Sequence, residues 1–363
     1  MAAHLWVALS PHGYGHGAMT APVVVELRRR RPGLRLTIQT GLPRPFLESR
    51  YGSDFTLVPE IPDFGLRMTS SIGVDLDASA EDYRRLHADW PAVVEREAER
   101  LSAAAPDLVL ANVPYVTIAA AARAGIQVAG YSSLEWSGIY ARYLGERPEA
   151  AQIAAQMLEA YNAGDVFLQV TPAMPMPNFR RLKLVGPVAR RGADRRDELR
   201  AMFGAEKVGL VAFGGIDHAL DWSRWPRMAG WTWLTTLDPP DRADVVVWEA
   251  AGMPFGDLMA SAEVVVTKPG YGTFTEAALS GTPVLYVPRP DWPESPHLDR
   301  WLERHTRALA VPLEALCGAG LEAQLRALFS LPERPLASPS GIAEAVEILE
   351  SMLDGKGPDC VRS

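Results

Sequence analysis

The fold is decided by the stretch Thr267-Lys268-Pro269-Gly270-Tyr271-Gly272-Thr273-Phe274-Thr275-Glu276. This stretch follows an apolar run at 264–266, and it precedes a helical run at 277–280 and a second apolar run at 284–287. The order predicts a strand, a helix and a second strand of a parallel sheet, with the stretch as the turn into the helix. Its glycines would let the backbone come close to a ligand.

The helix that starts in this stretch is expected to bind an anion. A helix N-terminus presents free N–H groups and the positive end of the helix dipole. Glu276 lies about one turn into the helix. A carboxylate at that position would suit the two neighbouring hydroxyls of a ribose. We therefore predict a nucleotide diphosphate site.

The composition is that of a globular protein and bounds the classes of partner. A length of 363 residues predicts two domains, and 48% hydrophobic residues allow a large core. The net charge of −8 argues against a nucleic-acid-binding surface. The two cysteines, Cys317 and Cys360, are too far apart in sequence to predict a disulfide framework or a zinc site.

The N-terminus does not resemble a signal peptide, because the apolar run at 5–9 is short and leads directly into a glycine loop. No apolar run approaches the roughly 20 residues that span a bilayer. We expect a soluble, cytoplasmic protein without a membrane span.

Apolar runs alternate with helical patterns along the chain, which predicts parallel sheets with helices on both faces. The strands expected are 4–10, 34–39, 55–58, 107–111, 127–131 and 166–170 in the first half, and 208–213, 231–235, 245–247, 264–266, 284–287 and 308–311 in the second. The helices expected are 18–31, 80–104 as one helix or a pair, 116–124, 149–162, 255–260, 297–305, 321–329 and 342–353. The region 41–78 is expected to be largely irregular.

The fold class is therefore α/β, with two Rossmann-like domains facing each other across a cleft. Prolines near 175–177 and at 187 indicate the boundary between them. We expect a C-terminal domain at 186–340 that would bind the nucleotide-bearing substrate, called the donor. An N-terminal domain at 1–185 would bind a second substrate, called the acceptor. Residues 341–363 would form a helix that packs back on the N-terminal domain, followed by a tail.

The first glycine loop is His12-Gly13-Tyr14-Gly15-His16. With Ala18 it matches a loose dinucleotide fingerprint, but the acidic residue expected after the second strand is missing. His16 is predicted to act as a base near neutral pH, because the glycines leave it little packing. Two alternatives stay open: a structural hydrogen bond that holds the loop, and a metal site with His12. The glycines argue against the helix that a metal pair at this spacing would need.

Three further loops follow predicted strands. Gly214 and Gly215 could donate N–H groups to the other side of the diphosphate, or form an ordinary tight turn. In 289–297, Asp291 and Glu294 could bind sugar hydroxyls, or the segment could be a solvated helix cap. The segments 112–114 and 132–136 could line the acceptor side. There Glu135 could orient His16 or a substrate, or it could cap a helix whose Trp136 is in the core.

These motifs resemble the glycosyltransferases of the B fold. The likeness rests on Gly270-Tyr271-Gly272-Thr273 with Glu276, on Gly281-Thr282-Pro283, and on Gly15-His16. A narrower likeness is to the glycosyltransferase-like N-terminal region of L-arabinokinase-type sugar kinases and their free-standing bacterial relatives. It covers most of residues 4–310. The further motifs that carry it are 12–16, 132–136 with Ile139-Tyr140, 176–180, 213–215, 268–273, Glu276-Ala277, and Arg289 with Asp291. No kinase-type part follows within the 363 residues, so kinase activity is not expected.

The resemblance implies transfer of a sugar from a nucleotide-diphosphate sugar to an acceptor hydroxyl or amine, without a metal or other cofactor. His16 would be the base or a diphosphate contact, and Glu276 would bind the ribose. The donor nucleotide site would comprise Gly214, Gly215, Lys268, Gly270, Tyr271, Gly272, Thr273 and Glu276. The donor sugar or the acceptor would be bound by His12, Gly15, Glu135, Arg289, Asp291 and Glu294. One departure is Trp292, which follows Asp291 where many relatives have glutamine after the acidic residue.

Two other functions stay open at this point. The same diphosphate site would serve a nucleotide-sugar hydrolase or 2-epimerase, and it would also serve a module that binds a nucleotide sugar without turning it over. The partners expected are a nucleotide sugar and an acceptor, with no nucleic acid. The sequence leaves a homodimer open.

Overall fold

The computed structural model describes residues 2–61, 63–69, 73–213 and 220–358. These residues form two compact units. Unit 1 comprises 2–69, 73–188 and 340–358, and unit 2 comprises 189–339. Each unit is built around one parallel sheet, as predicted. The alternation of β-branched runs with amphipathic segments explains both sheets, because parallel strands need a crossover segment between them.

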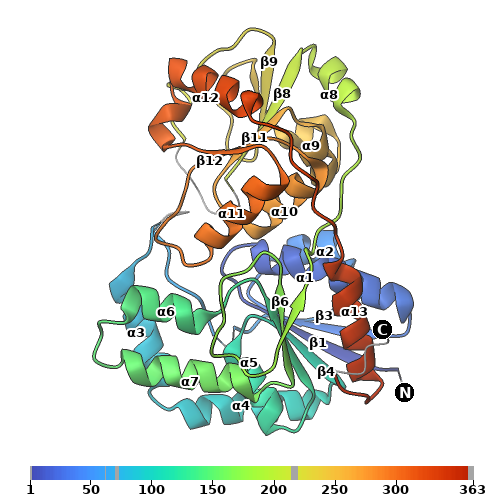
Figure 1. Cartoon of the computed structure of the whole chain (residues 1–363). Coiled ribbons are helices and arrows are strands. Elements are labelled where there is room, and N and C mark those ends of the chain that lie inside the picture. The colour runs from blue at the N-terminus through green and yellow to red at the C-terminus, as the bar shows by residue number, and fades with distance from the viewer. Residues whose placement is uncertain (1, 62, 70–72, 214–219, 359–363) are drawn as a thin grey trace. The chain divides into compact units, whose positions relative to one another are not determined.

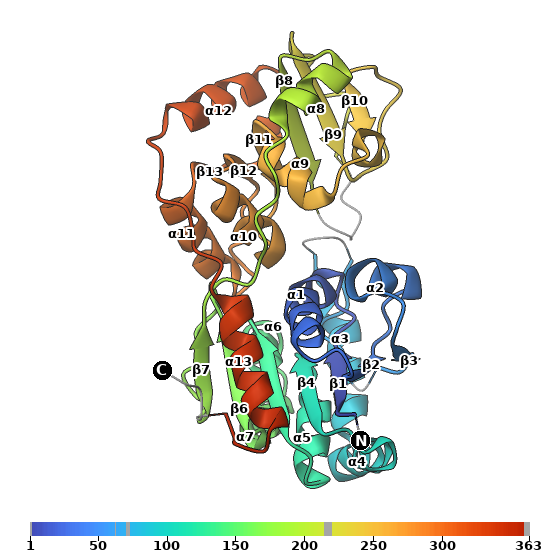
Figure 2. The same cartoon turned by 90° about the vertical axis from the view of Figure 1, so that its right-hand side faces the viewer.

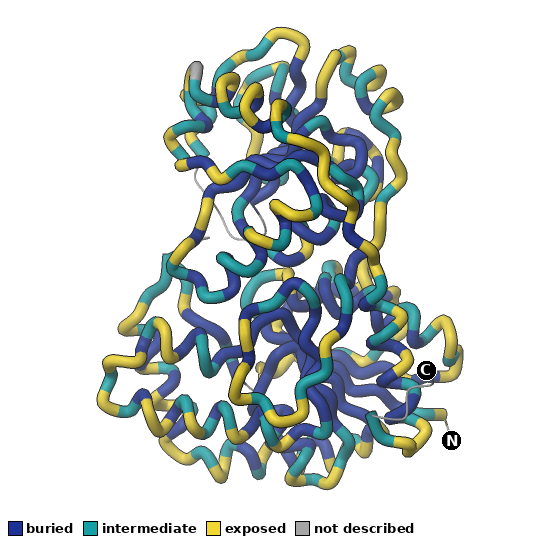
Figure 3. The backbone as a smooth tube through the Cα atoms, in the orientation of Figure 1, coloured by how far each residue is buried: buried dark blue, intermediate teal, exposed yellow. Residues whose placement is uncertain are grey.

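Unit 1 has a seven-stranded sheet with the order β3-β2-β1-β4-β5-β6-β7. Its strands are β1 His4–Leu9, β2 Arg35–Gln39, β3 Thr56–Val58, β4 Leu108–Asn112, β5 Val128–Ser132, β6 Val166–Val170 and β7 Leu182–Val185. Every residue of β1, β4, β5 and β6 is buried, and the strands are accordingly dark in Figure 3. The core of unit 1 therefore lies along its central strands.

Two layers of helices cover this sheet. The helices of unit 1 are α1 Gly15–Arg30, α2 Arg44–Tyr51, α3 Leu76–His87, α4 Trp90–Ala104, α5 Tyr115–Arg123, α6 Trp136–Leu144, α7 Ala150–Ala163 and α13 Gly341–Leu353. Because crossovers are right-handed, α1 lies on one face of the sheet and α4, α5 and α7 lie on the other. The last helix, α13, packs beside α1, where Arg30 and Arg31 pair with Glu350 (Figures 1 and 2).

Unit 2 has a six-stranded sheet with the order β10-β9-β8-β11-β12-β13. Its elements are α8 Arg196–Phe203, β8 Lys207–Ala212, β9 Trp231–Thr235, β10 Val245–Val247, the 3-10 helix Trp248–Ala251, α9 Phe255–Ser261, β11 Val264–Thr267, α10 Tyr271–Ser280, β12 Val284–Tyr286, α11 Ser295–His305, β13 Ala308–Ala310, the 3-10 helix Leu313–Leu316, and α12 Ala319–Ser330. Helices α9, α10 and α11 pack side by side. A cluster that includes Trp225, Trp231 and Trp233 packs with leucines of α12.

The chain leaves unit 1 after residue 188 and returns at 340. The segment before the exit and the segment after the return lie in contact. A Cβ atom on Gly186 would lie 1.9 Å from Oγ of Ser340, and one on Gly341 would lie 2.0 Å from the carbonyl oxygen of Gly186. The N–H of Gly341 donates to the carbonyl of Pro187 at 3.1 Å. Glycine is therefore required at both positions, because a side chain would collide with backbone or with a neighbouring side chain.

The structure differs from the prediction in several elements. The alternative of a pair of helices over 80–104 is confirmed by α3 and α4, whereas the region 41–78, expected to be largely irregular, contains α2 and the first residues of α3. The elements α2, α8 and β7 were not predicted, because each is too short for its pattern to stand out from the surrounding loops. Helix α6 is the helix that one of the two alternatives for Glu135 required. Among the described residues, no helix is both long and apolar enough to cross a membrane.

Candidate functional site

His16 lies in the first turn of α1, which begins at Gly15, three residues earlier than predicted. His12 and Gly13 precede the helix, so the two histidines do not share one helix, as predicted. Gly13 makes the preceding turn with φ 73°, a conformation that favours glycine. Glycine destabilises a helix mainly in its interior, so Gly15 is tolerated as the first residue of α1. His16 is only 6% exposed, so the expectation of little packing around it is wrong.

The ring of His16 is held by Asn112 at the end of β4. Nδ1 of His16 lies 2.9 Å from Oδ1 of Asn112. The Asn112 amide nitrogen donates to Oγ1 of Thr20 at 2.8 Å and to the carbonyl oxygen of His16 at 3.3 Å. A carbonyl oxygen only accepts, so the amide nitrogen must face it and Oδ1 must face the ring. Nδ1 therefore carries the proton, and Nε2 carries the lone pair.

Burial determines the charge of this histidine. Desolvation lowers the pKa of His16 to about 4, although the hydrogen bond to Asn112 raises it. His16 is thus neutral at pH 7, with Nε2 able to accept a proton. A neutral imidazole is the form that a general base needs, but the low pKa makes it a weak base.

Trp136 packs against both His16 and His12. The ring of Trp136, which is fully buried, lies edge-on to His16 at 5.9 Å and to His12 at 5.2 Å. Gly65 packs against the same rings: a Cβ atom there would lie 2.5 Å from the Trp136 ring and 2.9 Å from Nδ1 of His12. The structure therefore brings His12, His16 and Trp136 together. Gly15 is exposed beside them.

Glu135 follows the second of its two predicted alternatives, because it caps α6. Its carboxylate accepts from the N–H groups of Ser137 and Gly138, both at 2.7 Å, and from the hydroxyl of Ser137. It is 4% exposed, and burial raises its pKa. These bonds at the helix start account for the carboxylate, so a contact with His16 is not part of this structure.

In unit 2, the predicted anion site is the start of α10. The helix runs Tyr271–Ser280, and its N-cap Gly270 has no side chain to satisfy the first N–H groups. The N–H groups of Gly272 and Thr273 point out of the helix end, as in any first turn. Glu276 lies in the second turn and is half-buried. Gly214 and Gly215 lie outside the described residues.

Two basic side chains lie beside this helix start. Lys268 lies three positions before the first residue of α10, and Arg289 follows β12, the neighbouring strand. Burial, together with the charge of Arg289 and against the opposing charge of Glu294, lowers the pKa of Lys268 to about 8. Arg289 is 7% exposed, and its guanidinium carbon lies 4.3 Å from the centre of the Trp292 ring. The carboxyl ends of β11 and β12 thus concentrate positive charge.

The acidic residues of this loop are placed differently from each other. Glu294 is 6% exposed, and its Oε2 accepts from the indole N–H of Trp292 at 3.4 Å. It precedes α11 without capping it through its side chain, so it is not a solvated cap. Asp291 is half-exposed. No cluster of three or more potential metal ligands occurs among the described residues.

Two contributors were not predicted. The contact of Asn112 with His16 joins residues 96 apart in sequence, and Asn112 was expected only to line the acceptor side. Gly65 lies in the region predicted to be irregular. A weak signal existed for Asn112, because it ends an apolar strand where polar residues gather at the sheet edge.

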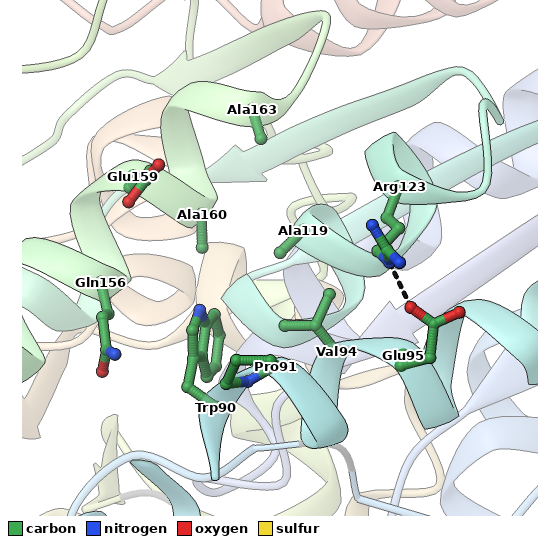
Figure 4. Close-up of a pocket in the computed structure, with 10 residues that line it drawn as sticks. All are labelled: Trp90, Pro91, Val94, Glu95, Ala119, Arg123, Gln156, Glu159, Ala160 and Ala163. Carbon is green, nitrogen blue, oxygen red and sulfur yellow. Dashed lines mark hydrogen bonds and ion pairs between the residues drawn. The ribbon is translucent and has the colours of Figure 1, made fainter.

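A cavity of unit 1 contains none of the predicted site residues. It has a volume of about 370 Å³ and lies among α4, α5 and α7 (Figure 4). Trp90, Val94 and Ala119 line it, and the Arg123–Glu95 ion pair lies at its side. By contrast, Asn112 and Trp136, which contact His16, lie at the end of β4 and at the start of α6, and neither lines this cavity.

The chain is similar to known proteins in sequence and in structure, although no family model matches it. It is 30% identical over 303 residues to L-arabinokinase of Arabidopsis thaliana. The aligned region covers 80% of this chain and 29% of that protein. The chain thus spans less than a third of the length of this relative.

Solved structures match over almost the whole chain. The glycotransferase of kitacinnamycin superposes with a TM-score of 0.60 at 18% identity, covering 98% of this chain and 96% of the other. The chain has the fold of the B-type glycosyltransferases. A Listeria monocytogenes protein assigned as a UDP-N-acetylglucosamine 2-epimerase superposes with a TM-score of 0.56 at 11% identity, covering 98% and 97%. In this B-type fold, the His16 cluster follows β1 of unit 1 and α10 follows β11 of unit 2.

Proposed function

We propose that the protein is a glycosyltransferase that takes a sugar from a nucleotide-diphosphate sugar. The observation that carries the proposal is the start of α10, where an uncapped helix N-terminus, Lys268 and Glu276 occur together in a B-type glycosyltransferase fold. The N–H groups and Lys268 suit a diphosphate, and Glu276 suits the ribose hydroxyls. The donor is assigned to unit 2 and the acceptor to unit 1.

The transfer step uses the neutral His16. Its Nε2 takes the proton of the acceptor hydroxyl or amine, and the acceptor atom bonds to the anomeric carbon of the sugar. The bond from that carbon to the diphosphate oxygen breaks, and the nucleoside diphosphate leaves with the bonding electrons. The helix N-terminus and Lys268 stabilise the negative charge on the leaving group, so the step needs no metal ion.

The first test is a thermal-shift panel of nucleoside diphosphates and their sugars, followed by turnover assays on the best donor with an acceptor panel. A nucleotide should raise the melting temperature of the native protein. His16→Ala should abolish turnover and leave nucleotide binding unchanged, because the residue lies in unit 1. If no nucleotide raises the melting temperature, the proposal fails.

A second candidate function is hydrolysis or 2-epimerisation of a nucleotide sugar. It is favoured by the similarity to the Listeria monocytogenes protein. Incubation of each donor without an acceptor distinguishes the two. Free nucleotide or a new sugar would support this second function, and product only when an acceptor is present would support transfer. Binding without turnover under either condition would indicate a nucleotide-sugar-binding module.

A further inference from the structure

Arg289 is a buried cation with an unsatisfied hydrogen-bonding edge. The residue is 7% exposed, and its Nε and Nη2 atoms are buried without a hydrogen-bond partner. The Nε–H bond and one Nη2–H bond lie in the guanidinium plane and point in the same direction from one edge of the group. They form the pair of parallel donors that binds two oxygens of one carboxylate or phosphate. The two unsatisfied atoms are therefore the two that make up one bidentate edge.

The carboxylates of the same loop do not satisfy this edge. Oδ1 of Asp291 lies 4.0 Å from Nε of Arg289, beyond hydrogen-bond distance. Oε2 of Glu294 accepts from the indole of Trp292. Asp291 thus provides only a long ion pair. Burial of two unpaired donors of a charged group is costly, so such an arrangement calls for a ligand to complete it.

The surroundings hold the guanidinium in place and add positive charge. Its carbon lies 4.3 Å from the centre of the Trp292 ring, and Trp292 is itself buried. The charges of Arg289 and Lys268 are close enough to act on each other, although like charges repel. A buried cation and a half-buried one at the ends of neighbouring strands favour an anion between or beside them.

We infer that Arg289 binds two oxygens of one anionic group on the ligand of unit 2. It would do so through its Nε–H and Nη2–H donors, a pair that we call the oxyanion fork. The inference rests on the proposed binding of a nucleotide sugar, which offers two sources of such a group. One is a phosphate of the diphosphate, and the other is the carboxylate of a uronic acid sugar. Both present two coplanar acceptors at the spacing of the Nε and Nη2 donors.

The test is calorimetric binding of pyrophosphate, UDP, UDP-glucose and UDP-glucuronic acid to the native protein and three variants. Arg289→Gln removes the charge, and Arg289→Lys keeps the charge but removes the fork. Arg304→Gln is the matched control, because Arg304 is an exposed arginine on α11. Loss of a charged bidentate contact should weaken binding about 10- to 100-fold, and Arg289→Lys should recover little of it. The control should bind as the native protein does.

The pattern of losses identifies the source of the oxyanion. Weaker binding of all four probes by Arg289→Gln would assign the fork to a phosphate, and weaker binding of UDP-glucuronic acid alone would assign it to the carboxylate. Unchanged binding of every probe by Arg289→Gln would overturn the inference, as would a native protein that binds none of them. If the native protein binds pyrophosphate but no nucleotide, the proposed function fails, and the pyrophosphate affinity of Arg289→Gln alone decides the inference.

A stability measurement separates this role from a structural one. Arg289→Met keeps the length and the apolar contact with Trp292 but removes the buried charge. Its melting temperature without ligand should equal or exceed that of the native protein, while the pyrophosphate-induced shift should disappear. A lower melting temperature together with an unchanged ligand-induced shift would show that the guanidinium serves folding, and it would overturn the inference.

Discussion

Nδ1 of His16 and Oδ1 of Asn112 lie 2.9 Å apart, and this contact joins the first turn of α1 to the end of β4. It determines which ring nitrogen carries the proton, because the amide of Asn112 is oriented by Thr20 and by the carbonyl of His16. A neutral amide orients the ring without stabilising its charged form as strongly as a carboxylate would. The protonation behaviour of His16 can therefore be tested at Asn112.

Asn112→Asp should raise the pKa of His16, because a carboxylate beside Nδ1 stabilises the imidazolium. In the native protein the pKa is lowered to about 4 by burial. The acid limb of the turnover profile should move to higher pH in the variant. NMR titration of the His16 ring measures the pKa directly, and Asn162→Asp, outside the site, is the control. Equal pKa values in the native protein and Asn112→Asp would contradict the assigned contact.

His16 should make the free energy of unfolding depend on pH. Its pKa is about 4 in the folded protein and 6.5 in the unfolded chain, so the unfolded chain binds more protons between these values. The stability from neutral His16 is complete above about pH 6.5 and is lost as the pH falls toward 4, on the order of 3 kcal/mol in total. Urea unfolding of the native protein and His16→Gln across this range measures it. The same slope in both proteins would rule out this contribution.

Glu276→Gln should weaken nucleotide binding about 10- to 100-fold, because it removes a charged acceptor for two hydroxyls. The affinity for the corresponding 2′,3′-dideoxynucleotide should change little, since the hydroxyls are then already missing. Calorimetry with both ligands measures the difference. Glu333→Gln, an exposed residue of unit 2, is the control. An equal loss for both ligands would show that Glu276 does not act through the ribose.

Gly65→Ala should destabilise unit 1 by about 1–3 kcal/mol, because the new Cβ would lie 2.5 Å from the fully buried Trp136 ring. Displacement of Trp136 and His12 should also reduce turnover while nucleotide binding in unit 2 is unchanged. Gly33→Ala is the matched control, since nothing lies within 4 Å of its Cβ position. Urea unfolding and binding measurements on both variants test this. A similar stability in both would contradict the close contact at Gly65.

The two sheets were predictable because their strands are short apolar runs bounded by glycine and proline. The strands at 166–170, 231–235 and 245–247 match the structure residue for residue. The turn into α10 was also predictable, because Gly270 stands between an apolar strand and a regular helix. By contrast, α1 starts earlier than predicted, since Gly15 is its first residue and glycine destabilises a helix mainly in the interior.

The contacts of the site were less accessible from sequence. His16 meets Asn112 because β1 pairs with β4, and the order of strands in a sheet does not follow from their order in the chain. The charge of Arg289 predicts exposure, whereas its packing on Trp292 buries it. For Glu135, the sequence allowed either a ligand contact or a helix cap, and the position of the Ser137 and Gly138 N–H groups decides for the cap.

Gly186 and Gly341 lie in contact, so the chain leaves unit 1 and returns to it at neighbouring points on either side of residues 189–339. Unit 2 is thus an insertion between β7 and α13, and unit 1 keeps both ends of the gap together through its own hydrogen bonds. A short bridge between the two ends could replace the whole insertion without rerouting unit 1. In a gene, such a segment can be exchanged in one piece, so unit 2 could be replaced while unit 1, which carries His16, is inherited unaltered.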